Sequence, residues 1–222
     1  MTDGFVGAWL VTEYVHDPDG TFAGVVHQRR LLRMLESGAV RVTQVCEPDA
    51  ALAGHPMDAF RGEWEFDLVA DGAARRYLGP DVVGYGTEWS PGAMTGRGIW
   101  PRFGYAFESY GVLVAPDRQL TGGFFSLAGR SVADIVGVAV PEADGTDYAT
   151  LALDATPPDV AVEADSIGRQ VGPMQVTESW PSPTERVRTW ALTDSDGTEV
   201  VIAEHSDSSG PPHATVTITP PP

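Results

Sequence analysis

The chain of 222 residues contains no lysine and no asparagine, and all 14 of its basic residues are arginine. Its 31 acidic residues outnumber these arginines and give a formal net charge of −17 at pH 7. A surface with this excess of negative charge repels phosphate groups. We therefore expect neither nucleic acid nor an anionic membrane as a partner.

Cysteine is almost absent, since Cys46 is the only one in the chain. A single cysteine excludes disulfide bonds within the chain and cannot supply a cysteine-rich zinc site. The five histidines are scattered, without the close spacing of metal ligands. No metal is therefore expected, and a buried, unreactive thiol is the preferred interpretation of Cys46.

Long apolar runs and recognisable targeting segments are also missing. No apolar run is long enough to span a bilayer, and the first residues do not form a signal peptide. The chain also lacks phosphate-binding glycine loops and a Gly-x-Ser-x-Gly nucleophile elbow. These absences favour a cytoplasmic protein that works without a cofactor.

What the sequence does contain is a series of short segments in which apolar and polar residues alternate. In the segment 61–68, large apolar residues occupy one side and charged residues the other, as in a strand with one buried face. One segment, 27–35, fits a helix or a strand, and the turn that follows it favours the strand. The sequence predicts an all-β fold of about 10–12 antiparallel strands with little helix, closed as a barrel or packed as a sandwich.

The expected domain organisation is a single β-barrel over residues 1–222. Within it, the stretch 79–104 is dense in glycine, proline and aromatic residues and contains no repeat. Long loops in compact domains are usually functional or mobile. We predict that this stretch is a loop that caps a pocket in the barrel.

The beginning of the chain resembles a known group of barrels. The motif Phe5-x-Gly7-x-Trp9, followed by Tyr14 and a turn at 17–20, is similar to the first hairpin of the calycins, which include the lipocalins and bacterial lipocalin-like proteins. The resemblance implies an antiparallel up-and-down barrel that holds an apolar small molecule. It also implies that Arg186 or Arg188, from a late strand, packs over Trp9. Some bacterial lipocalin-like barrels are cyclases of natural-product pathways, including ones that promote intramolecular cycloadditions.

The candidate catalytic residues are Glu178, Arg188 and Tyr110. Glu178 lies on an otherwise apolar face of the segment 174–180, where burial would raise the pKa of its carboxyl. Whether Arg188 lies on the same face as Glu178 depends on the register between their two strands, because a shift of one residue moves every side chain to the other face. The pair is interpreted either as catalytic or as a structural ion pair at one end of the barrel, while the Tyr110 phenol could bond a ligand carbonyl.

Three functions are compatible with these features. The preferred one is binding of a hydrophobic small molecule and its cofactor-independent cyclisation or isomerisation in secondary metabolism. The alternatives are a non-catalytic binding protein and a structural module whose barrel is filled by side chains. The oligomeric state is open, a homodimer included. The predicted ligand-binding residues are Trp64, Phe66, Tyr85, Trp89, Trp100, Tyr105, Met174 and Trp180.

Overall fold

A computed structural model of the chain describes residues 2–72, 74–143, 160–163, 166–171, 174–194, 196–207 and 210–222. Within these residues lie sixteen β-strands and three short 3-10 helices. The chain forms two compact units. Met1–Pro18 and Phe22–Leu151 make the first, and Asp19–Thr21 and Ala152–Pro222 make the second.

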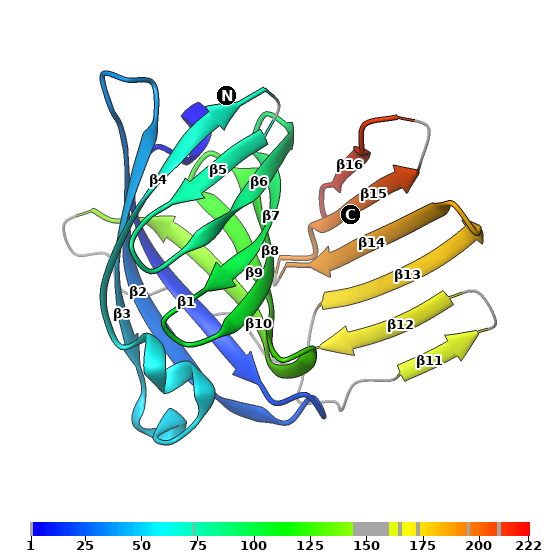
Figure 1. Cartoon of the computed structure of the whole chain (residues 1–222), viewed down its shortest axis with the longest axis horizontal. Helices are drawn as coiled ribbons and strands as arrows, with labels where there is room; N and C mark the ends of the chain where they lie inside the picture. The colour runs from blue at the N-terminus through cyan, green and yellow to red at the C-terminus, as the bar shows by residue number, and fades with distance from the viewer. Residues whose placement is uncertain are drawn as a thin grey trace. The chain divides into compact units, whose positions relative to one another are not determined.

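Ten strands of the first unit form a closed antiparallel barrel (Figure 1). Each strand pairs with its neighbour in sequence, and β1 closes the barrel against β10. The predicted all-β, up-and-down antiparallel barrel with little helix is thereby confirmed. The barrel strands are β1 (Gly7–His16), β2 (Phe22–Met34), β3 (Val40–Pro48), β4 (Gly62–Asp71), β5 (Ala74–Leu78), β6 (Val83–Ser90), β7 (Ala93–Trp100), β8 (Tyr105–Ala115), β9 (Arg118–Leu127) and β10 (Arg130–Pro141).

The three 3-10 helices occupy positions next to strand ends. Helix η1 (Thr2–Phe5) precedes β1, while η2 (Ala50–Leu52) and η3 (Pro56–Phe60) connect β3 to β4. The Asp49 carboxylate accepts the first backbone N–H groups of η2, and the His55 ring does the same for η3. These caps fix the connection between β3 and β4 because they satisfy N–H groups that a short helix leaves unpaired.

The stretch 79–104 is not a loop, and this prediction is wrong. It contains β6 and β7, which are paired with each other and with β5 and β8. Its glycines lie where these strands approach closely: a Cβ on Gly84 would lie 2.3 Å from the Arg97 carbonyl oxygen, and one on Gly98 would lie 2.4 Å from that of Val83. Glycine is therefore required by strand packing here, although its abundance is typical of loops.

The second unit is a six-stranded antiparallel sheet in the order β11 to β16 (Figure 1). The sequence places the strands from 174 onward in the barrel, and this placement is wrong. The barrel is already closed by the pairing of β1 with β10, so it has no free edge to which further strands could be added. The strands of this sheet are β11 (Val160–Glu163), β12 (Ser166–Val171), β13 (Met174–Ser182), β14 (Glu185–Thr193), β15 (Glu199–Asp207) and β16 (His213–Thr219).

Two predictions about the chain's organisation are not decided by this geometry. A strand expected at 148–155 lies outside the described residues. The single domain over residues 1–222 stays a prediction, because compact units in a structure do not by themselves show which segments fold together.

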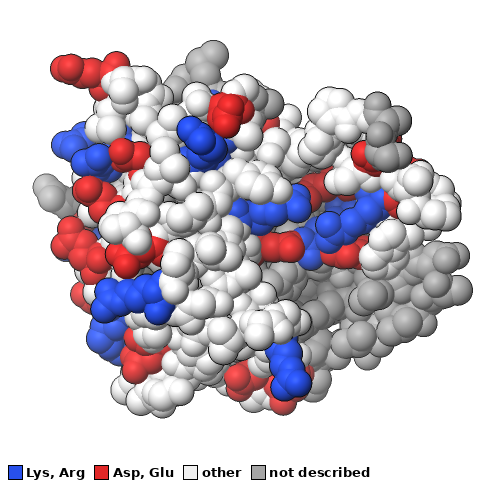
Figure 2. Space-filling view, viewed as in Figure 1, with Lys and Arg blue, Asp and Glu red and all other residues white. Residues whose placement is uncertain are grey.

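Figure 2 shows acidic side chains interspersed with arginines on the face in view. The helices among the described residues are short, and none is long and apolar enough to cross a membrane.

Candidate functional site

The barrel encloses a cavity of about 190 Å³. A single buried water needs about 10–15 Å³ on this measure, so the space is large enough for a small organic molecule. The described residues that line it belong to the barrel strands, their connections and helices η1 and η3. Most of them are apolar, as are Val26, Leu32, Val42 and Ile135.

A network of three polar side chains, the buried Glu13 and Gln28 and the partly buried Arg30, interrupts this apolar lining. Their strands are paired in a register that sets Glu13 opposite Val26, so Gln28 is a diagonal neighbour of the carboxylate on the same face. Gln28 Nε2 donates to Glu13 Oε2 at 2.5 Å, and Arg30 Nη2 donates to Gln28 Oε1 at 2.9 Å. Arg30 Nη2 also lies 3.4 Å from Glu13 Oε1. The glutamine thus joins the two opposite charges in one network.

Burial sets the proton affinity of the groups that line the cavity. It raises the pKa of the Glu13 carboxyl above its ordinary value, although the Arg30 charge and the hydrogen bonds from Gln28 and Arg30 act against it. Burial also raises the pKa of the Cys46 thiol and of the Tyr77 phenol to about 12 each. Cys46 and Tyr77 therefore stay protonated near neutral pH, whereas Glu13 is the lining group suited to proton transfer.

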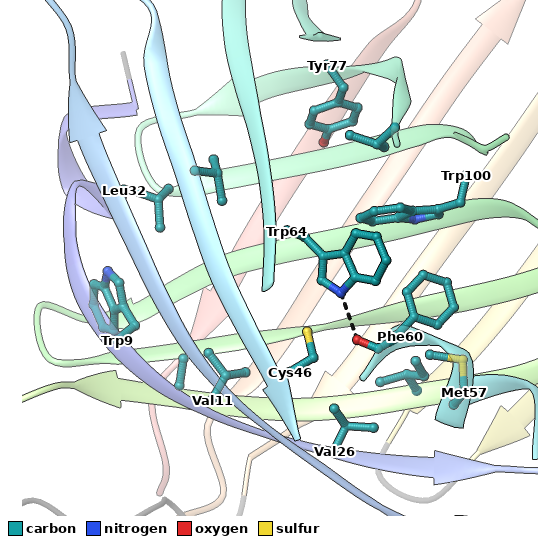
Figure 3. Packing of buried hydrophobic residues seen from close by; sticks show 14 of the residues in the cluster. Trp9, Val11, Val26, Leu32, Cys46, Met57, Phe60, Trp64, Tyr77 and Trp100 are labelled. Carbon is teal, nitrogen blue, oxygen red and sulfur yellow. Dashed lines mark hydrogen bonds between the residues drawn. The ribbon is translucent and has the colours of Figure 1, made fainter. Parts of the chain in front are cut away.

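One end of the cavity is formed by aromatic rings gathered around Phe60. The Phe60 ring centre lies 5.2 Å from that of Trp100, 5.0 Å from that of Phe103 and 5.2 Å from that of Phe125. The Trp64 indole donates to the Phe60 carbonyl oxygen at 2.7 Å (Figure 3). Tilted and edge-to-face contacts of this kind stabilise aromatic clusters beyond their burial.

The entry into β4 at Trp64 has the same local structure as the entry into β1 at Trp9, and we call each of them a tryptophan corner. Phe60-x-Gly62-x-Trp64 has the same spacing as Phe5-x-Gly7-x-Trp9, and each motif leaves a 3-10 helix and enters a strand. The Trp9 indole donates to the Phe5 carbonyl oxygen at 3.0 Å, just as Trp64 does to Phe60. Because β1 and β4 are separated by three antiparallel pairings, they start at opposite ends of the barrel. Each end therefore has the same tryptophan corner.

Five of the predicted residues lie in the barrel wall near the cavity. Phe66, Trp100 and Tyr110 line it. Trp64 and Tyr105 belong to the aromatic cluster, with Tyr105 stacked 6.0 Å from Phe60 and Trp64 5.6 Å from Trp100. The structure brings these residues together because β4, β7, β8 and β9 meet there.

Tyr85 and Trp89 do not line the cavity, and their expected position on a capping loop is wrong. Tyr85 is 44% exposed on β6, with the Arg97 guanidinium 5.2 Å from its ring centre. The Trp89 indole donates to the Thr95 hydroxyl at 2.8 Å within the wall.

The remaining predicted residues, Glu178, Arg188, Met174 and Trp180, belong to the six-stranded sheet and do not line the barrel cavity. Glu178 and Arg188 are register partners on β13 and β14, with Arg188 Nη2 2.8 Å from Glu178 Oε1. Arg186 also donates to the Glu178 carboxylate, at 3.2 Å through its Nε. Their placement inside a barrel is corrected, because the barrel closes without β13 and β14.

Sequence reasoning missed the polar network of the cavity. The signal was present, since Glu13 lies between Val11 and Val15 on one face of its strand, the same pattern that drew attention to Glu178. The arginine opposite Trp9 also comes from a different strand than the calycin resemblance implies. It is Arg30, the register partner of Trp9 on β2.

No group of three or more His, Cys, Asp or Glu side chains that could hold a metal ion occurs in the part of the chain that the structure describes. No protein-family model and no curated protein sequence matches the chain. The solved structures similar to it include a natural protein and a redesigned one. One is an S-type phycobiliprotein lyase from Guillardia theta, with 14% identity, 64% of this chain and 90% of that chain covered, and a TM-score of 0.49. The other is a redesigned β-barrel, with 13% identity, 64% and 95% covered, and a TM-score of 0.37. Neither likeness bears on what this chain binds.

Proposed function

We propose that the barrel binds a hydrophobic small molecule and promotes a cofactor-independent cyclisation or isomerisation of it. The observation that carries this proposal is the buried Glu13 carboxyl in the wall of a largely apolar cavity. An apolar cavity binds apolar surface because water is released. An acid with a raised pKa in such a cavity is a group that functional sites use.

Glu13 takes the role that the sequence assigns to Glu178. An isomerisation needs a group that removes a proton at one atom and returns it at another, and a carboxyl can do both. Gln28 and Arg30 hold the carboxyl in place through the contacts of 2.5 and 3.4 Å. The rings of Phe60 and Trp100 restrict the conformations of a flexible ligand, which favours ring closure.

The alternative function is binding without catalysis. It is favoured by the same network, because both Glu13 oxygens already have partners in Gln28 and Arg30. A purely structural barrel filled by side chains is disfavoured by the cavity itself. A role in secondary metabolism, a cytoplasmic location and a homodimeric state belong to the proposal and rest on the sequence alone.

Binding is tested by titrating the protein with an apolar environment-sensitive dye. Gly111 lines the cavity, and a Cβ there would lie 3.7 Å from both Met94 and Phe5, which is an ordinary contact. Gly111→Val should therefore fold, reduce the cavity and weaken dye binding. Val83→Ala, at a position 50% exposed on the outer wall, is the control and should bind as the wild type does. Equal binding by all three proteins would contradict the cavity as the site.

Catalysis is tested by incubating the protein with linear polyene precursors and analysing the products. A stereochemically single product, lost in Glu13→Gln while dye binding is retained, supports the reaction. If the dye binds saturably but the products are the same with and without protein, the reaction is contradicted and the protein is a non-catalytic binding protein. A search of the neighbouring genes for a natural-product assembly line would test the link to secondary metabolism.

A further inference from the structure

When the Glu13 carboxyl is ionised, the charges of the cavity lining sum to zero. Of the charged residues in the lining, Glu13 and Arg30 belong to the polar network and offset each other. The third, Glu108, lies between Phe107 and Ser109 of β8 and is the register partner of Arg97, which is exposed. Register partners lie on the same face of a sheet, so Arg97 lies next to Glu108 on that face and offsets its charge. No net charge is therefore available to balance a charged ligand.

The uncharged polar side chains of the lining can form hydrogen bonds with a ligand, but they cannot neutralise it. They include Gln28, Gln44, Gln119, Ser109, Thr121 and the phenols of Tyr77 and Tyr110. In a low-dielectric cavity, an ionised ligand group without a counter-ion is far less stable than in water. An anionic group would in addition be repelled by the Glu13 carboxylate.

The network uses only one of the three guanidinium nitrogens of Arg30, and one of the other two, Nε, is buried. Its Nη2 serves Glu13 and Gln28. Its Nε is buried and has no acceptor among the residues that the structure describes. A buried donor that lacks an acceptor is destabilising, and an oxygen atom of a bound molecule would supply what is missing.

From these three observations we infer that the ligand is uncharged and carries a carbonyl group, as in a ketone, an ester or an amide, whose oxygen accepts a hydrogen bond from Arg30 Nε. The apolar remainder extends toward the rings of Phe60 and Trp100, which line the cavity as well. This inference rests on the proposed binding function and adds the chemical class of the ligand. Arg30 is thus a specificity-determining residue that selects a neutral carbonyl.

The test compares three probes of equal carbon count, methyl hexyl ketone, octanamide and octanoate, by isothermal titration calorimetry at mildly alkaline pH. The ketone and the amide should bind the wild type about ten-fold or more tightly than octanoate, because the octanoate carboxylate would enter the cavity without a counter-ion and next to the Glu13 carboxylate. Arg30→Met should weaken binding of the ketone and the amide about ten-fold or more, because a hydrogen bond to a charged donor contributes about 1.5–3 kcal/mol and each 1.4 kcal/mol is ten-fold in affinity. Val83→Ala, on the outer wall, should leave the affinities for both probes unchanged.

Glu13→Gln provides the opposite control. It removes the negative charge and leaves the Arg30 guanidinium without a counter-ion, so it should reverse the preference toward octanoate. Tight octanoate binding by the wild type, or proton uptake on binding it, would overturn the inference while leaving the binding function intact. Failure of the dye and of all three probes to bind would overturn both. If Glu13→Gln does not fold, the comparison of head groups on the wild type and Arg30→Met decides the question.

Discussion

Glu13 occupies a position that a barrel normally gives to an apolar side chain. It faces the cavity between Val11 and Val15 and is 8% exposed. Such a position is tolerated because Gln28 and Arg30 satisfy both oxygens, and it is retained in proteins mainly where a buried ionisable group has a use. At the scale of single residues, this network distinguishes the cavity from an ordinary core.

The pKa shift of Glu13 predicts how stability depends on pH. The folded protein holds this proton more tightly than the unfolded chain, whose ordinary pKa is 4.5. The stabilising contribution is therefore complete below pH 4.5 and is lost as the pH rises through the folded-state pKa. Glu13→Gln does not titrate, so the free energy of unfolding of the wild type, relative to that of the variant, should fall as the pH rises above 4.5 in urea titrations.

Asp67 is a control, because its contribution to stability should change with pH in the opposite direction. Hydrogen bonds from Arg41 lower the pKa of its carboxyl below the ordinary 3.8. Its contribution is present above pH 3.8 and is lost as the pH falls through the folded-state pKa. The wild type should therefore lose stability relative to Asp67→Asn on acidification. The same direction of change for both variants would contradict the assignment of Glu13 as a desolvated acid.

Cys46 should be unreactive in the folded protein. It is 3% exposed, and burial raises the pKa of its thiol to about 12, so the nucleophilic thiolate is scarce. We expect no modification by iodoacetamide at mildly alkaline pH in the native state and rapid modification in urea, measured by intact mass. Modification of the native protein at the rate found in urea would show that the cavity admits solvent freely at this position.

At the scale of strands, the glycines of the barrel differ in whether they can be replaced by a residue with a side chain. A Cβ at Gly84 would lie 2.3 Å from a carbonyl oxygen of the neighbouring strand, whereas at Gly111 the nearest atoms are 3.7 Å away. Gly84→Ala should lower the free energy of unfolding by about 2 kcal/mol or more. Gly111→Ala should change it by about 0.5 kcal/mol or less. Urea unfolding of the two variants checks this, and equal effects would contradict the close approach of β6 and β7.

Strands in which apolar and polar residues alternate were predictable from the sequence, whereas the glycine-rich strands β6 and β7 were not. Trp64 and Phe66 alternate with charged residues, so β4 was evident from local pattern. In β6 and β7 the glycines are required by contacts between strands, which a local pattern does not reveal. The repeated corner at Trp64 was readable from the spacing of Phe60, Gly62 and Trp64, but its position at the opposite barrel end depends on topology.

The position of the candidate site could not be predicted from local sequence pattern either. Glu13 and Glu178 lie in equivalent local patterns, each on an apolar strand face. What separates them is the sheet to which each strand belongs. This is decided by the closure of β1 against β10, whose paired residues lie 118 to 132 positions apart in sequence. Pairing over that distance depends on the whole chain. Tyr110 could be predicted on a strand because the segment 105–115 has a strand pattern, whereas Trp100 was expected on the capping loop and lies instead at the end of β7.

At the scale of the whole molecule, the two compact units raise the question of which segments fold together. The barrel has its own buried core, and all ten strands are paired on both sides. We expect a fragment of residues 1–143 to retain the near-ultraviolet circular dichroism of the buried Trp64 and Trp100 and to unfold cooperatively. A fragment that aggregates or lacks this signal, together with a single transition for the whole chain, would support one domain over residues 1–222.

The aromatic cluster at the end of the cavity has an optical consequence. Trp100 lines the cavity, and its indole centre lies 5.6 Å from that of Trp64. Indoles this close share their electronic excitation, and a guest that moves one of them alters the coupling between both. The barrel therefore carries an intrinsic spectroscopic reporter of occupancy, and binding of colourless molecules can be followed without attaching a label.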